Sequence, residues 1–340
     1  MPVACEHPLE DEPKAGVRGY LLRFASVVLL GTALLGALSG ELVRRNFSSI
    51  DDANASYRDL GGRWVPQIQD EDVFYSNIGN SIAAVKAADI VFLGASFVSF
   101  GINRNTLQSS QPLSRLKVYN MAFAGVRAGE FSRRVITHWN IRAPLWIINV
   151  DDHVQSFFTD NLDLTLGQIK TPITAVQRSW MNGYLTVARR DLKWRIEVLI
   201  AAIKAKHTSP LEFYRSVSNG DFLLADNPQY IADHDPVHVT RDPDCHTNPT
   251  VLDYARKYLK DLGGSVVFML IPHSNACARQ AVELASALNV ELIMPPLDEF
   301  TDIDGGGHLD KKGAEKFTSY LAGELVKARA FRRAFSTQLD

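Results

Sequence analysis

The stretch of sequence from residue 89 to residue 103 reads DIVFLGASFVSFGIN. Its apolar run, Ile90–Leu93, is followed by Gly94, and Ser96 comes directly after this small-residue turn. A short uninterrupted apolar run is typical of a strand that is buried on both faces of a parallel sheet. The stretch therefore predicts a strand, a turn and a helix, with the Ser96 hydroxyl at the carboxyl end of the strand.

Similar apolar runs alternate with amphipathic stretches along the chain. The further runs are Val118–Met121, Leu145–Val150, Ser265–Ile271 and Val290–Met294, and the helical patterns are Gly129–Ile141, Val251–Leu262, Ala276–Leu288 and Lys311–Ala328. Apolar strands separated by helices are what a parallel sheet covered on both faces requires. We therefore expect an α/β fold with a doubly wound, mostly parallel sheet in three flavodoxin-like layers, which binds ligands at the carboxyl ends of its strands.

The alternation is interrupted between the third and fourth predicted strands, at about residues 156–249. A long helical pattern, Ile173–Ala205, is followed there by a polar stretch rich in Asp, Asn and Pro. We expect an insertion that either lies over or beside the site or forms a passive helical appendage. The predicted organisation is an N-terminal tail (1–18), a membrane segment (19–43), a linker with a lead-in helix (46–88), a catalytic domain (89–328) and a C-terminal tail (329–340).

The composition is that of a globular protein of ordinary charge. Of 340 residues, 46% are hydrophobic and 22% are charged, which excludes global disorder and leaves ample material for a core. The 36 Lys and Arg residues nearly balance the 38 Asp and Glu residues, and no basic run is interleaved with aromatic residues. The composition therefore argues against binding of nucleic acid.

An apolar segment near the N-terminus predicts the compartment. Residues 24–38 read FASVVLLGTALLGAL and contain no charge. Extended to residues 19–43, the segment has the length of a short membrane helix, with Arg23 and Glu41 near its ends. We expect an uncleaved signal anchor in the inner membrane, with residues 46–340 in the periplasm. The alternatives are cleavage near residues 37–39 (Ala-Leu-Ser) and a buried core helix.

The three cysteines are Cys5, Cys245 and Cys277, and they are too few and too scattered for a structural zinc site. Cys5 precedes the apolar segment and is expected on the opposite side of the membrane from the other two. In an oxidising compartment Cys245 and Cys277 could form one disulfide. The alternative is a pair of unrelated thiols.

Polar candidates follow the second, third and fourth predicted strands. These candidates are Asn120 and Gly125 after the second strand, Asn149, Asp151, Asp152 and His153 after the third, and His273 after the fourth. Backbone N–H groups at the Gly125 turn are suited to an oxyanion hole. The Asp-Asp-His cluster could bind a metal, but its spacing matches no strong motif, and we expect no metal or other cofactor.

The last predicted loop carries the most informative pattern. Residues 300–325 read FTDIDGGGHLDKKGAEKFTSYLAGEL, so an aspartate, a glycine-rich turn and His308 come just before an amphipathic helix. His308 on this loop can take a proton from Ser96 while Asp304, or less favourably Asp302, accepts its second N–H. The pattern predicts a Ser-His-Asp arrangement, with the backbone N–H groups of Ser96 and Gly125 binding the oxyanion.

Three blocks of the chain together resemble the SGNH/GDSL hydrolase family. VFLGASFVSFGI resembles its first block, NMAFAG its second and GGGHLDKKGAEKFT its last, which implies Ser96 as nucleophile, Gly125 in the oxyanion hole and His308 as base. Two positions depart from the family pattern. The family's Asp stands three residues before its His, where this chain has Gly305, with Asp304 one residue further back. The position of the family's oxyanion Asn is Asp151 here, with Asn149 two residues earlier.

More narrowly, the blocks are similar to the membrane-anchored branch that accompanies bacterial polysaccharide O-acetylation, such as that of alginate. This resemblance implies an extracytoplasmic serine esterase or O-acyltransferase for O-acyl, above all O-acetyl, groups of a carbohydrate. Its implied partners are an acylated carbohydrate or acyl donor and a membrane-bound acyltransferase.

Two alternatives stay open. One is a non-catalytic, anchored module that binds a glycan or supports a membrane acyltransferase. A separation beyond about 6 Å between Ser96 Oγ and His308 Nε2 would favour it, because a triad needs near hydrogen-bond reach. The other is a metal-dependent hydrolase that uses Asp151, Asp152 and His153.

Overall fold

The computed structural model describes residues 19–31, 33–34, 56–60, 74, 80–123, 128–150, 212–222, 224, 228–238, 245–274, 276–296, 299–305 and 307–336.

A five-stranded sheet forms the centre of the molecule. Its strands are β2 (Ile90–Leu93), β3 (Val118–Asn120), β4 (Leu145–Asn149), β7 (Ser265–Met269) and β8 (Glu291–Ile293), in the order β3-β2-β4-β7-β8. Every neighbouring pair is parallel, which confirms the predicted α/β class with a parallel sheet. The chain goes from β2 to β3 on one side and then to β4 on the other, so the crevice for ligands is expected at the carboxyl ends of β2 and β4.

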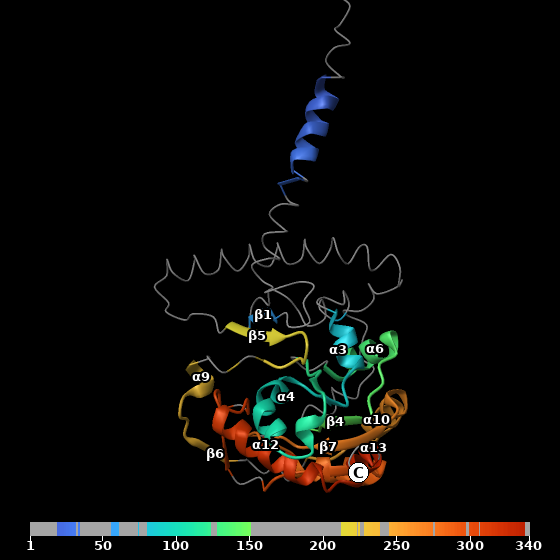
Figure 1. The fold of residues 1–340 in the computed structure, drawn as a ribbon, viewed down its shortest axis with the longest axis vertical. Coiled ribbons are helices and arrows are strands. Elements are labelled where there is room, and N and C mark those ends of the chain that lie inside the picture. The colour runs from blue at the N-terminus through green and yellow to red at the C-terminus, as the bar shows by residue number, and fades with distance from the viewer. Residues whose placement is uncertain are drawn as a thin grey trace, which may run out of the picture.

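Helices cover both faces of this sheet (Figure 1). One face carries α3 (Ser81–Lys86), α6 (Ala128–Trp139), α10 (Pro249–Leu262) and α11 (Ala278–Leu288). The other carries α4 (Ser96–Gly101), α5 (Arg104–Ser109), the short 3-10 helix η2 (Leu113–Arg115), α12 (Lys311–Leu325) and α13 (Arg329–Phe335). Successive strand residues face opposite sides, so Val91 packs in the first core and Phe92 in the second.

Two small antiparallel sheets attach other segments to this body. β1 (Ser56–Leu60), within the expected linker, pairs with β5 (Glu212–Ser216). β6 (Pro236–His238), which follows the one-turn helix α9 (Pro228–Ile231), pairs with β9 (Glu299–Thr301). The expected insertion is thus connected to the strand that leads into the His308 loop. The long helix expected at 173–205 lies outside the described residues.

The C-terminal end corrects the sequence-based prediction of a tail. Residues 329–335 form α13, and its Phe331 and Phe335 side chains are fully buried. Four residues apart, they lie on one face of the helix, with ring centroids 4.9 Å from each other. Glu291 of β8 accepts hydrogen bonds from the first N–H groups of α13, at 2.9 Å and 2.8 Å. A seven-residue helix with several arginines is too short to show a clear period, which is why the sequence did not reveal it.

The apolar N-terminal segment is helical at residues 19–31 and 33–34. Its large side chains are exposed, for example Leu29 at 70% and Leu30 at 71%. Within the described part of the chain, no helix is both long enough and apolar enough to cross a membrane.

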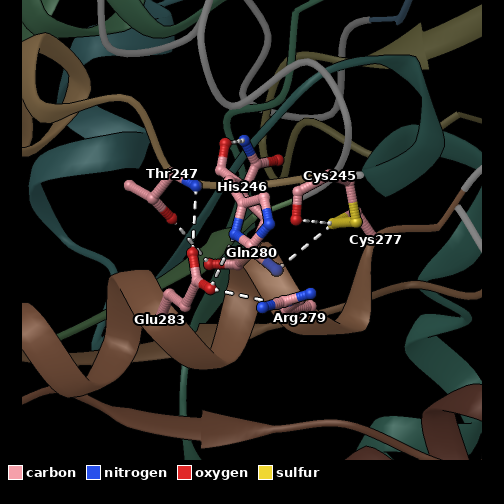
Figure 2. Close-up of a disulfide and its surroundings, with 7 residues drawn as sticks. All are labelled: Cys245, His246, Thr247, Cys277, Arg279, Gln280 and Glu283. Carbon is pink, nitrogen blue, oxygen red and sulfur yellow. Dashed lines mark hydrogen bonds and ion pairs between the residues drawn. A yellow bond between two sulfur atoms is a disulfide. The ribbon is translucent and has the colours of Figure 1, made fainter. Parts of the chain in front are cut away.

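A disulfide joins Cys245 to Cys277 at the start of α11, with Cα atoms 6.1 Å apart. Figure 2 shows the polar contacts beside it. Glu283 accepts hydrogen bonds from the Thr247 backbone N–H (3.0 Å) and pairs with His246 (3.1 Å), and these contacts lower the pKa of its carboxyl. The structure therefore realises the disulfide alternative and fixes the end of the insertion to α11.

The packing of α13 predicts a large effect of one substitution. Phe331→Ala should lower the free energy of unfolding by about 3–5 kcal/mol, because it removes a fully buried ring from the core. Arg332→Ala, on the exposed face of the same helix, should change it by no more than about 0.5 kcal/mol. Equilibrium urea unfolding measures both values, and equal effects would show that α13 is not part of the core.

Candidate active site

Ser96 is the first residue of α4, directly after β2 and next to β4. The turn that places it depends on Gly94. A Cβ atom at position 94 would lie 2.3 Å from the Val98 side chain and 3.1 Å from Asn149 Cβ. Only glycine therefore allows the chain to pass so close to α4 and β4, which leaves the half-buried Ser96 at the switch point of the sheet.

His308 lies on a tight hairpin between β9 and α12. The Ile303 N–H donates to the His308 carbonyl at 2.9 Å, and the Asp310 N–H donates to the Thr301 carbonyl at 3.2 Å, so the two arms pair. The Asp302 carboxylate, only 3% exposed, lies inside the turn and accepts the N–H groups of Gly305 and Gly307, both at 2.8 Å. Asp302 therefore fixes the shape of the hairpin.

The base of the hairpin is anchored to α12 by Asp310. This fully buried residue is the N-cap of the helix, and its Oδ1 accepts the Gly313 N–H at 2.7 Å. The same oxygen accepts the Thr301 hydroxyl at 2.6 Å. Helix and strand are thus held together at the base of the hairpin by one carboxylate.

The hairpin brings three of the predicted residues into contact. His308 Nε2 is 2.8 Å from Ser96 Oγ, and His308 Nδ1 is 2.5 Å from Asp304 Oδ2. An Nδ1–H that donates to Asp304 leaves Nε2 as the acceptor for the Ser96 hydroxyl. Asp304 therefore occupies the third position that Asp302 was the alternative for, and the glycine turn accommodates the additional residue between aspartate and histidine.

Aromatic rings hold the imidazole of His308. Phe97 and Phe100 of α4 lie with their centroids 5.3 Å and 4.8 Å from it. Phe97 also stacks on His273, at 4.8 Å and an interplanar angle of 9°, and a Cβ atom at Gly307 would lie 2.1 Å from His273 Cβ. His273 is thus part of the packing behind the hairpin. Sequence reasoning missed this cluster, although the apolar residues one and four positions after Ser96 were a signal for it.

The described part of the insertion lies beside this cluster. Phe222 contacts Phe100, with centroids 5.6 Å apart, and the guanidinium of the fully buried Arg215 lies 5.6 Å from the Phe222 ring. Arg215 also donates to the Asn120 carbonyl at 2.8 Å, which fixes the segment to the end of β3. Burial raises the pKa of nearby Asp221, while its ion pair with Arg104 acts in the opposite direction. These contacts favour the insertion beside the site over a passive appendage.

The remaining candidates have different surroundings. Asn149 is buried, and its Oδ1 accepts the Ile271 N–H at 3.0 Å, which joins β4 to the end of β7. Asn120 braces β3 against α4, since its Nδ2 donates to the Val98 carbonyl at 3.3 Å. The other predicted residues, Gly125, Asp151, Asp152 and His153, lie outside the described residues. Among the residues that are described, no group of three or more His, Cys, Asp or Glu side chains is placed to hold a metal ion.

The arrangement has the chemistry of an activated serine. The Ser96 hydroxyl donates to an imidazole whose other nitrogen is held by a carboxylate, as nucleophilic catalysis requires. Its own backbone N–H opens α4 and has no partner within the helix, so it is suited to binding an oxyanion. The Ser96–His308 distance is well inside the limit of about 6 Å beyond which a binding module would be favoured.

Comparisons with protein-family models, curated proteins and solved structures found no match to this chain. The class of site is therefore argued from its geometry and from the sequence blocks.

The close approach of Gly307 to His273 predicts a specific loss of activity. Gly307→Ala should push the hairpin away from His273, and a displacement of about 1 Å should slow turnover of an activated ester about 100-fold. Gly305→Ala is the matched control, because its backbone is also left-handed (φ +68°) but no atom lies within 4 Å of the new Cβ. It should cost about 1–2 kcal/mol of stability while activity at low temperature falls far less. Equal losses of activity in the two variants would contradict the role of this contact.

Proposed function

We propose that this protein is a serine esterase or O-acyltransferase of the SGNH type. The observation that carries the proposal is the continuous contact from Ser96 through His308 to Asp304. The three residues come from the first strand-to-helix turn and from the last loop of a parallel sheet, where the resemblance to SGNH hydrolases also locates the nucleophile and the base.

In the proposed reaction Ser96 Oγ attacks the carbonyl carbon of an ester while His308 Nε2 takes the hydroxyl proton. The backbone N–H groups of Ser96 and Gly125 stabilise the negative charge that develops on the carbonyl oxygen. Collapse of the tetrahedral intermediate breaks the bond to the alcohol oxygen, which receives the proton from His308. Water or a sugar hydroxyl then attacks the acyl-Ser96 ester, and His308 again accepts and returns a proton.

Asp304 has the smaller role in this proposal. It orients the imidazole and stabilises its charged form, but its side chain is 42% exposed, so solvent screens the interaction. The same exposure is the feature that favours the alternative, a non-catalytic glycan-binding or scaffold module. The order of effects among the three residues therefore separates the two functions.

We further propose an extracytoplasmic, membrane-anchored location and a carbohydrate O-acyl, above all O-acetyl, substrate. The location is supported by the exposed apolar side chains of the N-terminal helix and by the Cys245–Cys277 disulfide, which is the bond expected in an oxidising compartment. The substrate class and a membrane-bound acyltransferase as partner rest on the sequence resemblance.

Substitutions in the triad test the reaction. Ser96→Ala should abolish hydrolysis of p-nitrophenyl acetate and of an O-acetylated polysaccharide, because no nucleophile remains, and stability should change by no more than about 0.5 kcal/mol. Ser319→Ala, at an exposed position of α12, is the matched control and should keep full activity. His308→Ala should lose about as much as Ser96→Ala, and Asp304→Asn distinctly less. Full activity of a folded Ser96→Ala protein would contradict the mechanism.

The disulfide tests the location. Protein taken from intact cells and alkylated without reductant should be modified at Cys5 alone among its three cysteines, because Cys245 and Cys277 are bonded to each other. After reduction, mass spectrometry should find all three modified. Alkylation of all three before reduction would contradict an oxidising compartment.

A further inference from the structure

A pocket of about 470 Å³ lies beside the base of the His308 hairpin. It is lined by residues that follow β7 and β8, by β9, by the first residue of β6 and by one side of α12, but neither Ser96 nor His308 lines it. Its volume is within the range of about 300–1,000 Å³ that small-molecule sites occupy. The pocket is therefore large enough for a ligand of its own or for a further unit of an extended substrate.

The pocket and the triad share one structural element. Thr301 lines the pocket, and two residues further on Ile303 pairs with His308. Two residues of an extended strand span about 7 Å. Gly313, which also lines the pocket, is bound by Asp310 at the base of the same hairpin. A chain-like ligand with one unit at Ser96 can thus reach the pocket with another.

The lining combines flat apolar surfaces with positive charge. Phe300 and Phe317 are almost fully buried, while Tyr320 is exposed at the edge of the pocket. Such rings, together with four prolines, offer rigid apolar surface to the C–H faces of a ring-shaped ligand.

Two lysines, Lys312 and Lys316, line the pocket one helical turn apart. Lys312 pairs with Asp233 of the insertion, whereas Lys316 has no ion pair with any described residue. Glu299 is the one carboxylate among the described lining residues. The ammonium group of Lys316 is therefore available to an anionic ligand.

We propose that this pocket is a subsite for a carboxylate-bearing sugar unit of the glycan whose ester is presented to Ser96. The aromatic and proline surfaces take the apolar face of the sugar ring, and Lys316 takes its carboxylate. The assignment of the ester to Ser96 rests on the proposed function, whereas the preference of the pocket for an acidic sugar does not. The substrate class that follows is an O-acylated acidic polysaccharide.

Isothermal titration calorimetry on the full-length chain tests this preference, in the Ser96→Ala background to prevent turnover. The probes are tetragalacturonate and its carboxyl-reduced, neutral counterpart. The acidic probe should bind about tenfold tighter than the neutral one, and this advantage should shrink at high salt. Lys316→Glu should remove the advantage. Lys311→Glu changes the same charge on the same helix outside the pocket and should leave the affinity within about twofold.

Tyr320→Ala should weaken both probes, because it removes apolar surface that they share. Equal affinity for the two probes, no binding of either, or equal effects of Lys316→Glu and Lys311→Glu would overturn the subsite. Hydrolysis of p-nitrophenyl acetate by the Ser96-containing protein is measured in parallel. A preference for the acidic probe without esterase activity would leave the subsite standing and reject the proposed reaction, and esterase activity without that preference would do the reverse.

Discussion

The two hydrogen bonds that the Asp302 carboxylate accepts from Gly305 and Gly307 are the constraint on which the site depends. Glycine-rich turns lose more conformational entropy on folding than other segments do, so this turn needs a strong internal contact to hold one shape. A buried carboxylate that accepts two N–H groups supplies such a contact, because hydrogen bonds to charged groups contribute about 1.5–3 kcal/mol each. His308 reaches Ser96 only while this shape is kept.

The rest of the fold positions the two ends of that contact. Ser96 follows the first strand of the parallel sheet, and His308 stands 212 residues later, just before α12. Both reach the carboxyl edge of the sheet because β2 lies in its middle and α12 packs on the same face as α4. Asp310 fixes the hairpin to α12, and Phe97 and Phe100 connect α4 to the imidazole. The geometry of the site is thus a consequence of how two helices pack against one face.

Much of this architecture could be predicted from sequence, since buried parallel strands are continuous apolar runs. The predicted and observed bounds of β2 are the same, and the core helices begin or end within a few residues of their amphipathic patterns. Ser96 and His308 were found because they stand beside small-residue turns at strand or helix ends. The choice between Asp302 and Asp304 needed coordinates, because both are close enough in sequence to His308 and only the path of the turn separates their roles. The short strands β6 and β9, the helix α13 and the docking of Arg215 were missed because three to seven residues carry no readable period.

The central claim is that His308 activates Ser96. Labelling of the full-length protein with a fluorophosphonate, followed by mass spectrometric mapping of the modified peptide, tests it most directly. The geometry predicts a single adduct on Ser96, strongly slowed in His308→Ala and absent in Ser96→Ala. Labelling of another serine, or equal labelling of Ser96 with and without the imidazole, would contradict it.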